Sequence, residues 1–305
     1  MQRQCNLKNK GILVESNTAN KDIARYIAES AEAYLAPDGR RHPVISLKTA
    51  ASIANSQGIS AKEVEITALR QGIVPQRYLR NIGTIGLDGQ IKLLQSTVAV
   101  VGAGGLGGTI IELLARQGVG HLIIIDNARF TERNLNRQIM STERNLGEYK
   151  VTVAAKRAGE INSAITVTTF LKKLTKENAP KLLAGAQVVA DGLDNLPSRF
   201  AVEHTCRDLA IPYVYASIAG FGGQLMTIFP EDMGLSSLYG SSSNTMPEQG
   251  IETRIGNPSA IPAMIAALQV QEIVKIITGV GTPMRNQILL VDATECTIDR
   301  IELTR

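Results

Sequence analysis

The sequence contains little cysteine. Its 305 residues include only Cys5, Cys206 and Cys296, which lie far apart and form no C-x-x-C pair. This spacing predicts neither a disulfide framework nor a thiolate zinc site, and a reducing compartment fits it best. The three histidines also lack the spacing of metal ligands. The motifs that carry chemistry must therefore be built from other residue types.

Long hydrophobic runs are also absent. The N-terminus has no apolar run typical of a signal peptide. The longest apolar stretch, residues 261–278, carries Gln269, Glu272 and Lys275, which an isolated membrane span does not readily tolerate. We therefore expect a cytoplasmic protein without a membrane segment. A formal net charge of +4 suits an anionic cofactor or an acidic partner and does not point to nucleic acid.

Residues 1–74 predict a small helical N-terminal extension to a larger domain of residues 75–305. Apolar residues between 23 and 35 share one helical face, and Pro37-Asp38-Gly39 supplies a turn after it. A short helix is expected at residues 90–95, directly before the larger domain's first strand.

Two capped helices are predicted inside this extension. Ser46 can cap a helix that ends at Gly58, and Ser60-x-x-Glu63 is a capping-box pattern that opens the next helix. The spacing resembles a helix-turn-helix, but no basic recognition face is evident. A helical hairpin that packs on the main domain or on a partner is therefore favoured over DNA binding.

From residue 97 onward, strand and helix patterns alternate, which is typical of a doubly wound Rossmann-like parallel sheet. The predicted strands cover residues 98–101, 122–126, 165–171, 187–191 and 213–217, and later helices cover residues 149–162, 176–183 and 197–209. In the C-terminal part, the alternation of strand and helix patterns ends. This part predicts a strand at 224–229, an aperiodic functional loop at 230–257, a long buried helix with Pro258 in its first turn, and a hairpin of strands 287–292 and 297–303. We expect a mostly parallel sheet with antiparallel C-terminal strands.

The glycine-rich segment 102–107 indicates a nucleotide site. A buried strand precedes Gly102-x-Gly104-x-x-Gly107, an amphipathic helix follows, and a second strand ends at Asp126. Glycines let the backbone approach a phosphate, and the helix N-terminus offers unpaired N–H groups to an anion. An acid at the position of Asp126 typically binds ribose hydroxyls, which suits ATP and NAD equally.

The charges downstream favour a triphosphate. Arg137 and Lys150 follow the second strand, and Asp191 and Asp194 lie at the carboxyl end of a later strand. A carboxylate there can hold Mg²⁺ together with phosphate oxygens. Asp194 and Asn195 could instead only cap the following helix, and the sequence leaves this alternative open.

Together these residues resemble a known family. They comprise Arg77-Tyr78-x-Arg80, Gly102-Ala-Gly-Gly-Leu-Gly107, Asp126, Asn134-Leu-Asn-Arg-Gln138, Lys150 and Asp191-x-x-Asp194-Asn195. They look like the ubiquitin-activating E1-like superfamily, and more narrowly like its bacterial sulfur-carrier adenylyltransferases of the MoeB/ThiF/HesA group. The resemblance covers about residues 75 to 303.

The resemblance implies ATP-dependent adenylation of a protein's C-terminal carboxylate, with release of pyrophosphate. The partner would be a small ubiquitin-fold sulfur-carrier protein that ends in Gly-Gly. By the family pattern Asp194 would bind Mg²⁺, and Arg137 and Lys150 would contact the phosphates. Asp126 would hold the ribose.

Further binding residues also come from the resemblance. Gly104 and Gly105 would line the nucleotide, and Asn134 and Asn195 would also bind it. Arg80 would act in catalysis by reaching the phosphates of the other protomer's site, which makes a homodimer part of the expectation. Asn81 stands where the family usually has Gln, a mild departure.

Two departures concern the steps after adenylation. Family members often carry two C-x-x-C pairs for a structural zinc, and this chain has neither, so we predict no zinc. Enzymes of this type that bond covalently to their partner place a cysteine in the loop 231–257, where this chain has none. Cys206 and Cys296 are expected to be buried, inert thiols. A free acyl-adenylate is therefore the expected product.

Other functions remain open on the sequence. The chain could adenylate another carboxylate, such as a peptide C-terminus or the threonylcarbamoyl group on tRNA, because residues 1–75 could clamp a different substrate. An NAD-dependent oxidoreductase would share the glycine turn and Asp126, but it would leave Arg137, Lys150 and Asp194 unexplained. A non-catalytic scaffold would need none of these residues. The carrier and the sulfur donor cannot be read from the sequence.

Overall fold

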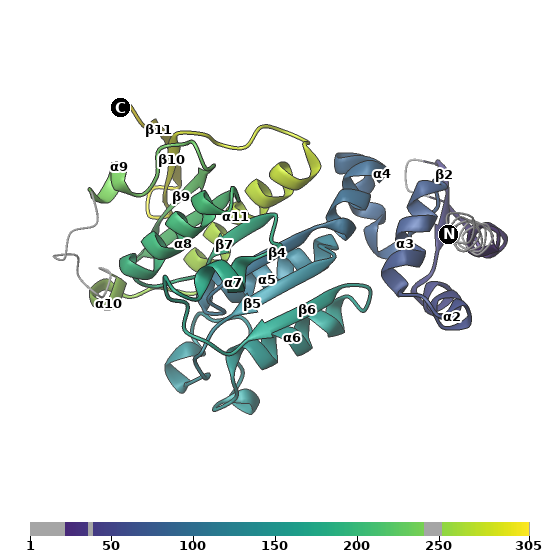
Figure 1. Cartoon of the computed structure of the whole chain (residues 1–305), viewed down its shortest axis with the longest axis horizontal. Helices are drawn as coiled ribbons and strands as arrows, with labels where there is room; N and C mark the ends of the chain where they lie inside the picture. Colours follow the sequence, from purple (N-terminus) through teal and green to yellow (C-terminus); the bar gives the residue numbers. More distant parts are fainter. Residues whose placement is uncertain (1–21, 36–38, 241–251, 305) are drawn as a thin grey trace, which may run out of the picture. The chain divides into compact units, whose positions relative to one another are not determined.

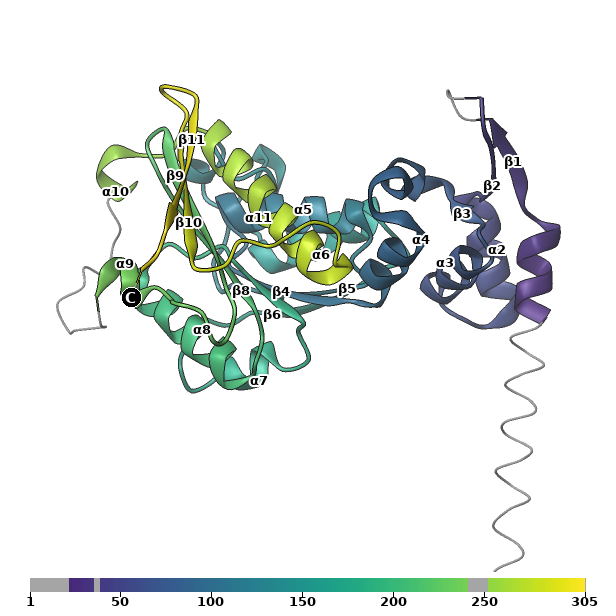
Figure 2. The same cartoon turned by 90° about the horizontal axis from the view of Figure 1, so that it is seen from above.

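The computed structural model describes residues 22–35, 39–240 and 252–304, and Figures 1 and 2 show the chain in two views. The chain forms two compact units, Met1–Leu94 and Gln95–Arg305. The functional division at residue 75 stays a prediction.

The N-terminal unit combines helices with a small sheet. After a helix at residues 22–29, its elements are β1 (Glu32–Leu35), β2 (Arg41–Ile45), α2 (Leu47–Gln57), α3 (Ala61–Arg70), β3 (Val74–Pro75), a 3-10 turn at Gln76–Tyr78 and α4 (Leu79–Gln95). The sheet has the order β1-β2-β3, with β1 antiparallel and β3 parallel to β2. The extension is therefore a mixed α/β unit, whereas the sequence predicted helices alone.

The two predicted helix caps are confirmed. The Ser46 hydroxyl accepts a hydrogen bond from the Thr49 N–H, and α2 ends at Gly58, whose φ of 65° suits glycine. At α3 the Ser60 hydroxyl accepts from the Glu63 N–H, while the Glu63 carboxylate accepts from the Ser60 N–H. The reciprocal pair satisfies two backbone donors at the helix start.

Substituting Ser60 tests how much this capping box contributes. We expect Ser60→Ala to lower the free energy of unfolding by about 1 kcal/mol, because the Glu63 N–H loses its acceptor. Urea titration followed by circular dichroism measures the change. The matched control is Ser60→Asn, whose side chain also caps and should keep most of the stability. Equal unfolding midpoints for Ser60→Ala and the unchanged chain would contradict the assignment.

One helix prediction in this unit is wrong at its end. The helix does not extend to residue 35, because the chain turns at Ser30 and residues 32–35 pair with β2, placing Tyr34 opposite His42. Pro37 and Asp38 of the predicted turn lie outside the described residues. The predicted helix at 90–95 is present as the last part of α4, after the non-helical residue Gly86 with φ 68° and ψ 178°.

The C-terminal unit holds an eight-stranded sheet. Its strands are β4 (Thr97–Val101), β5 (His121–Ile125), β6 (Thr166–Phe170), β7 (Val188–Asp191), β8 (Tyr213–Ala219), β9 (Gly222–Ile228), β10 (Gln287–Asp292) and β11 (Thr297–Glu302). Its helices are α5 (Gly105–Gln117), α6 (Lys150–Ile161), α7 (Ala179–Leu183), α8 (Leu196–Asp208), α9 (Ser236–Tyr239), α10 (Glu252–Ile255) and α11 (Ala260–Thr278), with 3-10 turns at Glu132–Asn134 and Glu143–Asn145.

The sheet confirms the doubly wound prediction. Its order is β11-β10-β9-β8-β7-β4-β5-β6, in which β8, β7, β4, β5 and β6 run parallel and β9, β10 and β11 are antiparallel. Helices α5, α6 and α11 cover one face of the sheet, and α7 and α8 cover the other (Figure 2). The strand order reverses between β4 and β7, and such switch points are where these folds bind ligands.

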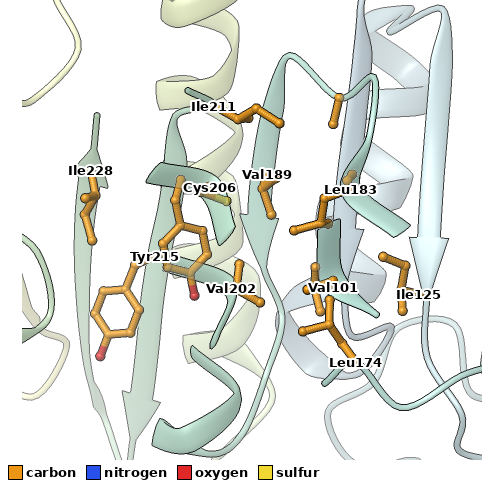
Figure 3. Packing of buried hydrophobic residues seen from close by; sticks show 14 of the residues in the cluster. Val101, Ile125, Leu174, Leu183, Val189, Val202, Cys206, Ile211, Tyr215 and Ile228 are labelled. Carbon is orange, nitrogen blue, oxygen red and sulfur yellow. The ribbon is translucent and has the colours of Figure 1, made fainter. Parts of the chain in front are cut away.

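Apolar side chains from β4, β5, β7 and β8 pack under α7 and α8 (Figure 3). Val101, Ile125 and Val189 from the strands meet Leu183 and Val202 from these two helices in one buried cluster. This core fixes the carboxyl ends of β4, β5 and β7 relative to one another. The loops that follow these strands are therefore held on a rigid base.

The helix α11 packs against α5 and strands β7, β8 and β9. Within the described part of the chain, it alone is long and apolar enough to cross a membrane by length and composition, and half of that apolar window is buried inside the protein. Its burial indicates a core helix. Pro258 lies two residues before α11 begins, so its predicted place in the first turn is wrong. The predicted aperiodic loop contains the short helices α9 and α10.

Candidate active site

The glycine turn joins β4 to α5 through very close backbone contacts. Gly102 has φ +93°, and a Cβ on it would lie 2.4 Å from the Gly192 oxygen. A Cβ on Gly107 would lie 1.7 Å from the Gly102 oxygen. Neither position has room for a side chain. Gly104 is the N-cap of α5 and has no side-chain capping bond, so N–H groups of the first turn are available to an anion.

Asp126 directly follows β5 and holds this turn in place. Its Oδ2 accepts a hydrogen bond from the Ala103 N–H at 2.8 Å, and its Oδ1 accepts from the Ala128 N–H at 2.7 Å. The carboxylate therefore ties the glycine turn to the loop after β5. Each oxygen keeps a second lone pair that can accept from a ligand hydroxyl.

A cleft of about 810 Å³ lies over the carboxyl ends of the parallel strands. Its size is in the range of small-molecule sites, which run from about 300 to 1,000 Å³. The sequence-predicted residues that line it are Gly104, Gly105, Asp126, Arg137, Lys150, Asp194 and Asn195. Residues far apart in the chain thus meet in one concave site.

Positive charge gathers on one side of this cleft. Lys150 opens α6 and is only 9% exposed, and Arg133 and Arg137 line the cleft beside it. Burial lowers the pKa of Lys150, while the nearby carboxylates of Asp126 and Asp194 oppose that shift. Burying a cation is costly without a compensating negative group. The geometry therefore favours an anionic ligand.

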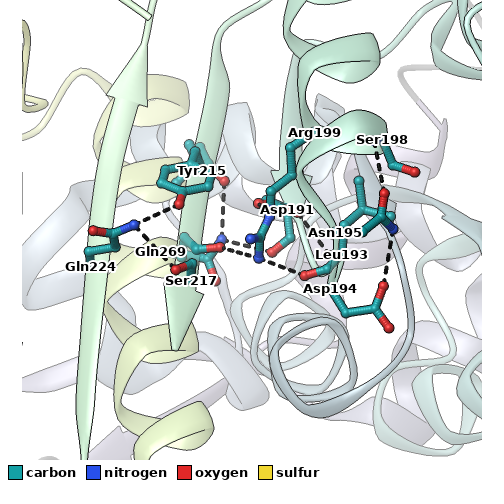
Figure 4. A network of polar contacts seen from close by, with 12 residues as sticks. Asp191, Leu193, Asp194, Asn195, Ser198, Arg199, Tyr215, Ser217, Gln224 and Gln269 are labelled. Carbon is teal, nitrogen blue, oxygen red and sulfur yellow. Dashed lines mark hydrogen bonds and ion pairs between the residues drawn. The ribbon is translucent and has the colours of Figure 1, made fainter. Parts of the chain in front are cut away.

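The two candidate carboxylates at the end of β7 have different environments (Figure 4). Asp191 is fully buried and forms an ion pair with Arg199 at 3.0 Å, and its Oδ1 accepts from the Leu193 N–H. Asp194 is exposed in the cleft, and its carboxylate accepts a hydrogen bond from the Asn195 amide at 3.1 Å. Asp194 can therefore accept a cation, whereas Asp191 is already paired.

Arg199 organises the segment that carries Asp194, a role that no motif of the sequence indicates. Its Nη2 donates to the carbonyl oxygens of Leu193 at 2.7 Å and Ala216 at 3.0 Å, while its Nε binds Asp191. Gln269 of α11 donates to the Asp191 backbone oxygen at 2.9 Å. These bonds link β7, β8, α8 and α11 directly beneath the cleft.

The two predicted asparagines have visible structural roles. Asn195 caps α8, because its Oδ1 accepts from the Ser198 N–H at 2.9 Å. The capping alternative therefore holds for Asn195, while Asp194 stays available. Asn134 is 6% exposed and is not one of the lining residues; its Oδ1 accepts from the N–H and hydroxyl of Thr131. Asn134 thus fixes the loop that carries Arg137. Arg80 lies on α4 in the N-terminal unit.

The cysteines fall in different places. Cys206 on α8 is buried, and burial raises the pKa of its thiol, which fits the predicted inert role. Cys296 lies between the two C-terminal strands of the hairpin and is exposed, so the prediction of burial is wrong for it. Its φ of 57° shows that it occupies a tight turn, which keeps the side chain outside the core. Cys5 lies outside the described residues.

The donor set at Asp194 fits Mg²⁺. This ion binds oxygen ligands, and at nucleotide sites it commonly takes one or two protein carboxylates together with phosphate oxygens and water. Asp194 is an exposed carboxylate in the same cleft as Lys150 and Arg137. Among the described residues no group of three or more His, Cys, Asp or Glu could hold a metal by themselves.

Comparison with known proteins shows the family of this chain. The model of the ThiF family matches residues 78–305. The SAMP-activating enzyme E1 of Haloferax volcanii is 31% identical over 74% of this chain and 84% of its own length. The sulfur carrier protein adenylyltransferase of Thermus thermophilus is 31% identical over 77% of this chain and 86% of its own. The sulfur carrier protein ThiS adenylyltransferase of Escherichia coli is 36% identical over 68% and 83%.

Solved structures show the same fold. Escherichia coli MccB with ATP has a TM-score of 0.63 at 21% identity, covering 84% of this chain and 83% of that one. MccB with AMPCPP and MccA has a TM-score of 0.65 at 19% identity, covering 86% and 80%. At this identity the likeness concerns the fold alone.

Proposed function

The chain belongs to the ThiF family, and we propose that it adenylates the C-terminal carboxylate of a small ubiquitin-like sulfur-carrier protein. ATP is the second substrate, and pyrophosphate is released. One observation carries this proposal: the cleft joins an anion-binding helix terminus, the cations of Lys150 and Arg137 and the exposed carboxylate of Asp194. The oxidoreductase alternative uses only the glycine turn and Asp126.

The reaction needs little proton chemistry. A C-terminal carboxyl group has a pKa of about 3.3 to 3.7 and is ionised at neutral pH. Its oxygen attacks the α-phosphorus of ATP and forms a new P–O bond, while the bond from that phosphorus to the bridging oxygen breaks. The electron pair leaves with pyrophosphate. The main obstacle is repulsion between two anions, so fixed cations and a fixed geometry are the effective catalysts.

The sequence-predicted residues of the cleft have different roles in the attack on the α-phosphorus. Lys150 and Arg137 bind phosphate oxygens, and the first turn of α5 receives a phosphate at Gly104 and Gly105. Asp126 accepts hydrogen bonds from the ribose hydroxyls. Asp126 also holds the glycine turn through the Ala103 N–H. The backbone N–H groups of that turn and the Asp126 carboxylate therefore keep fixed positions relative to one another.

The segment after β7 positions the metal. Asp194 would hold Mg²⁺, which when bound supplies positive charge to the phosphates. Asn195 supports it by capping α8 and by donating to the Asp194 carboxylate. Asn134 fixes the loop before Arg137, and its direct contact with the nucleotide stays a prediction.

The oligomeric state and the cellular location belong to the same proposal. By its family resemblance Arg80 reaches the phosphates of a second protomer's site, so the working form is a homodimer. The enzyme acts in the cytoplasm, makes a free acyl-adenylate, binds no zinc and depends on another protein for sulfur. No membrane or nucleic acid takes part.

Pyrophosphate exchange tests this function. We expect the chain with Mg²⁺, ATP, labelled pyrophosphate and a small Gly-Gly protein encoded nearby to return label into ATP, because adenylation is reversible until the product leaves. A thermal-shift titration should show stabilisation by Mg·ATP and none by NAD. Absence of exchange with every small Gly-Gly protein offered would count against the proposal, and stabilisation by NAD alone would favour an oxidoreductase.

A peptide C-terminus is the second candidate substrate. The family model matches residues 78–305 and leaves most of the N-terminal unit outside the match. The N-terminal unit would then hold a peptide in place of a folded carrier. Exchange with a peptide but with no Gly-Gly protein would support this candidate, and exchange with threonylcarbamoyl-tRNA alone would point to the tRNA alternative.

A further inference from the structure

Two side-chain oxygens of the cleft lack a partner. Among the described residues, Gln138 Oε1 and Asn257 Oδ1 are buried and accept no hydrogen bond, and both residues line the cleft. A buried polar atom left without a partner costs about 1–3 kcal/mol, so such an atom usually receives a hydrogen bond from water or from a ligand. Two such atoms in one cleft therefore point to a bound group.

Gln138 lies beside the glycine turn. Its side chain is 6% exposed, and its Nε2 lies 3.6 Å from the position that a Cβ on Gly104 would occupy. Its backbone N–H donates to Asn134 at 2.9 Å, which fixes the residue in the loop that also carries Arg137. The carboxamide is thus placed where the phosphate-binding turn borders the rest of the cleft.

Asn257 belongs to the same wall. The Asn136 Nδ2 donates to the Asn257 backbone oxygen at 3.3 Å, which ties the segment before α11 to the loop of Gln138. The preceding Gly256 oxygen accepts from the Gly220 N–H at 2.8 Å, which ties it to the turn between β8 and β9. The loop of Gln138 and the segment of Asn257 are therefore linked through Asn136, and we call Gln138 and Asn257 together the acceptor wall.

The chemistry of this wall does not suit a phosphate. The oxygens of an ionised phosphate are acceptors, so they cannot satisfy two carbonyl oxygens. ATP carries donors only on its ribose and its adenine; Asp126 already faces the ribose in the proposed function, and the adenine amino group is the competing donor that the Kd for Mg·ATP tests below. An extended peptide offers a row of main-chain N–H donors that ends in a carboxylate. Peptide main chain is the substrate part that fits.

We propose that Gln138 and Asn257 bind main-chain N–H groups in the last residues of the carrier tail. The proposal rests on the proposed function and deepens it, because it names the part of the substrate that the acceptor wall recognises. These residues act as specificity determinants. They hold the tail extended so that its carboxylate reaches the α-phosphorus, and the site selects a carboxylate that follows a peptide N–H.

The test removes one N–H from the substrate. A carrier that ends in sarcosine, which is N-methylglycine, keeps the carboxylate and loses the donor; a carrier that ends in alanine has the same composition and keeps it. We expect the sarcosine carrier to raise KM in pyrophosphate exchange about tenfold, because one buried acceptor stays unsatisfied. The alanine carrier should change KM much less. The penultimate glycine is tested in the same way.

Enzyme variants identify the acceptor. Gln138→Leu and Asn257→Ala should each raise KM for the natural carrier about tenfold and leave the Kd for Mg·ATP, measured by calorimetry, unchanged. One of the two should also lose the sarcosine penalty, since the donor and its acceptor form a coupled pair. The matched control is Gln271→Leu, an exposed glutamine of α11 outside the cleft lining, which should match the unchanged chain.

Each other outcome overturns the inference. Equal KM for the sarcosine and natural carriers, or a sarcosine penalty that persists in both variants, would show that the acceptor wall does not read these N–H groups. A weaker Kd for Mg·ATP with an unchanged carrier KM would assign the wall to a nucleotide donor. Failure of the proposed function has a different signature: the unchanged chain would show no exchange with any carrier.

Discussion

Replacing Lys150 with methionine should slow pyrophosphate exchange by about 10² to 10³. The ammonium group is nearly buried at the start of α6, in the same cleft as Asp126, Arg137 and Asp194. In the proposed reaction it offsets charge on the phosphates where the carboxylate attacks. Methionine fills similar space without charge, so the fold should persist and kcat should fall. Exchange kinetics and the circular dichroism spectrum of the same sample measure both.

Lys150→Arg is the matched control, because it keeps the charge. Burial lowers the pKa of Lys150, so the cation is present below that lowered pKa and is lost as pH rises through it. The exchange rate of the unchanged chain should therefore decline at alkaline pH. The decline should begin at a lower pH than it would if Lys150 were an exposed lysine with an ordinary pKa. Arginine stays charged, so the variant should lack this decline. A normal rate for Lys150→Met would contradict the assigned role.

Replacing Arg199 with methionine should lower the free energy of unfolding by about 3–5 kcal/mol. The substitution leaves the fully buried Asp191 carboxylate without its ion pair. It also removes the donors to the carbonyl oxygens of Leu193 and Ala216. Chemical denaturation measures the loss. In the chain that remains folded, the concentration of Mg²⁺ needed for half-maximal exchange should also rise, since Asp194 lies on the released segment.

The pair of the half-exposed Arg116 and the buried Glu112 gives a comparison. The Arg116 side chain is 54% exposed, and Glu112 also binds Arg157, so Arg116→Met should cost about 1 kcal/mol or less. The double variant Arg199→Met with Asp191→Leu removes both buried charges and should recover much of the lost stability. Equal losses for Arg199→Met and Arg116→Met would show that the buried network does not support the cleft.

The elements that the sequence predicts well are those with local signals. The caps at Ser46 and Ser60 and the strand, glycine turn and helix around Gly102 each depend on residues a few positions apart. The errors arise where distant residues decide. Residues 32–35 form a strand because β2 pairs with them, although their spacing favours a helix. The part of α4 before Gly86 was missed because its glycines disfavour a helix, yet this part buries Ile85.

The candidate site also combines residues that local sequence signals predict with residues that only the fold reveals. Asp126, Lys150 and Asp194 follow predicted strands or open a predicted helix, so the sequence places them on one edge of the sheet. The choice between Asp191 and Asp194 needs the structure, because only the fold shows that Arg199 pairs with Asp191. The acceptor wall also needs it. Gln138 belongs to a quoted motif, but Asn257 reaches it through a contact with Asn136 across 121 positions of the chain.

Intact mass spectrometry of the carrier tests the central claim most directly. The carrier protein is incubated with the chain, Mg²⁺ and ATP, and its mass is compared with that of a carrier lacking its last two residues. We expect the full-length carrier to gain one adenylyl group and the shortened carrier to gain none. An unchanged mass of the full-length carrier, in a sample where the chain binds ATP, would contradict the proposal that this cleft adenylates a protein's C-terminal carboxylate.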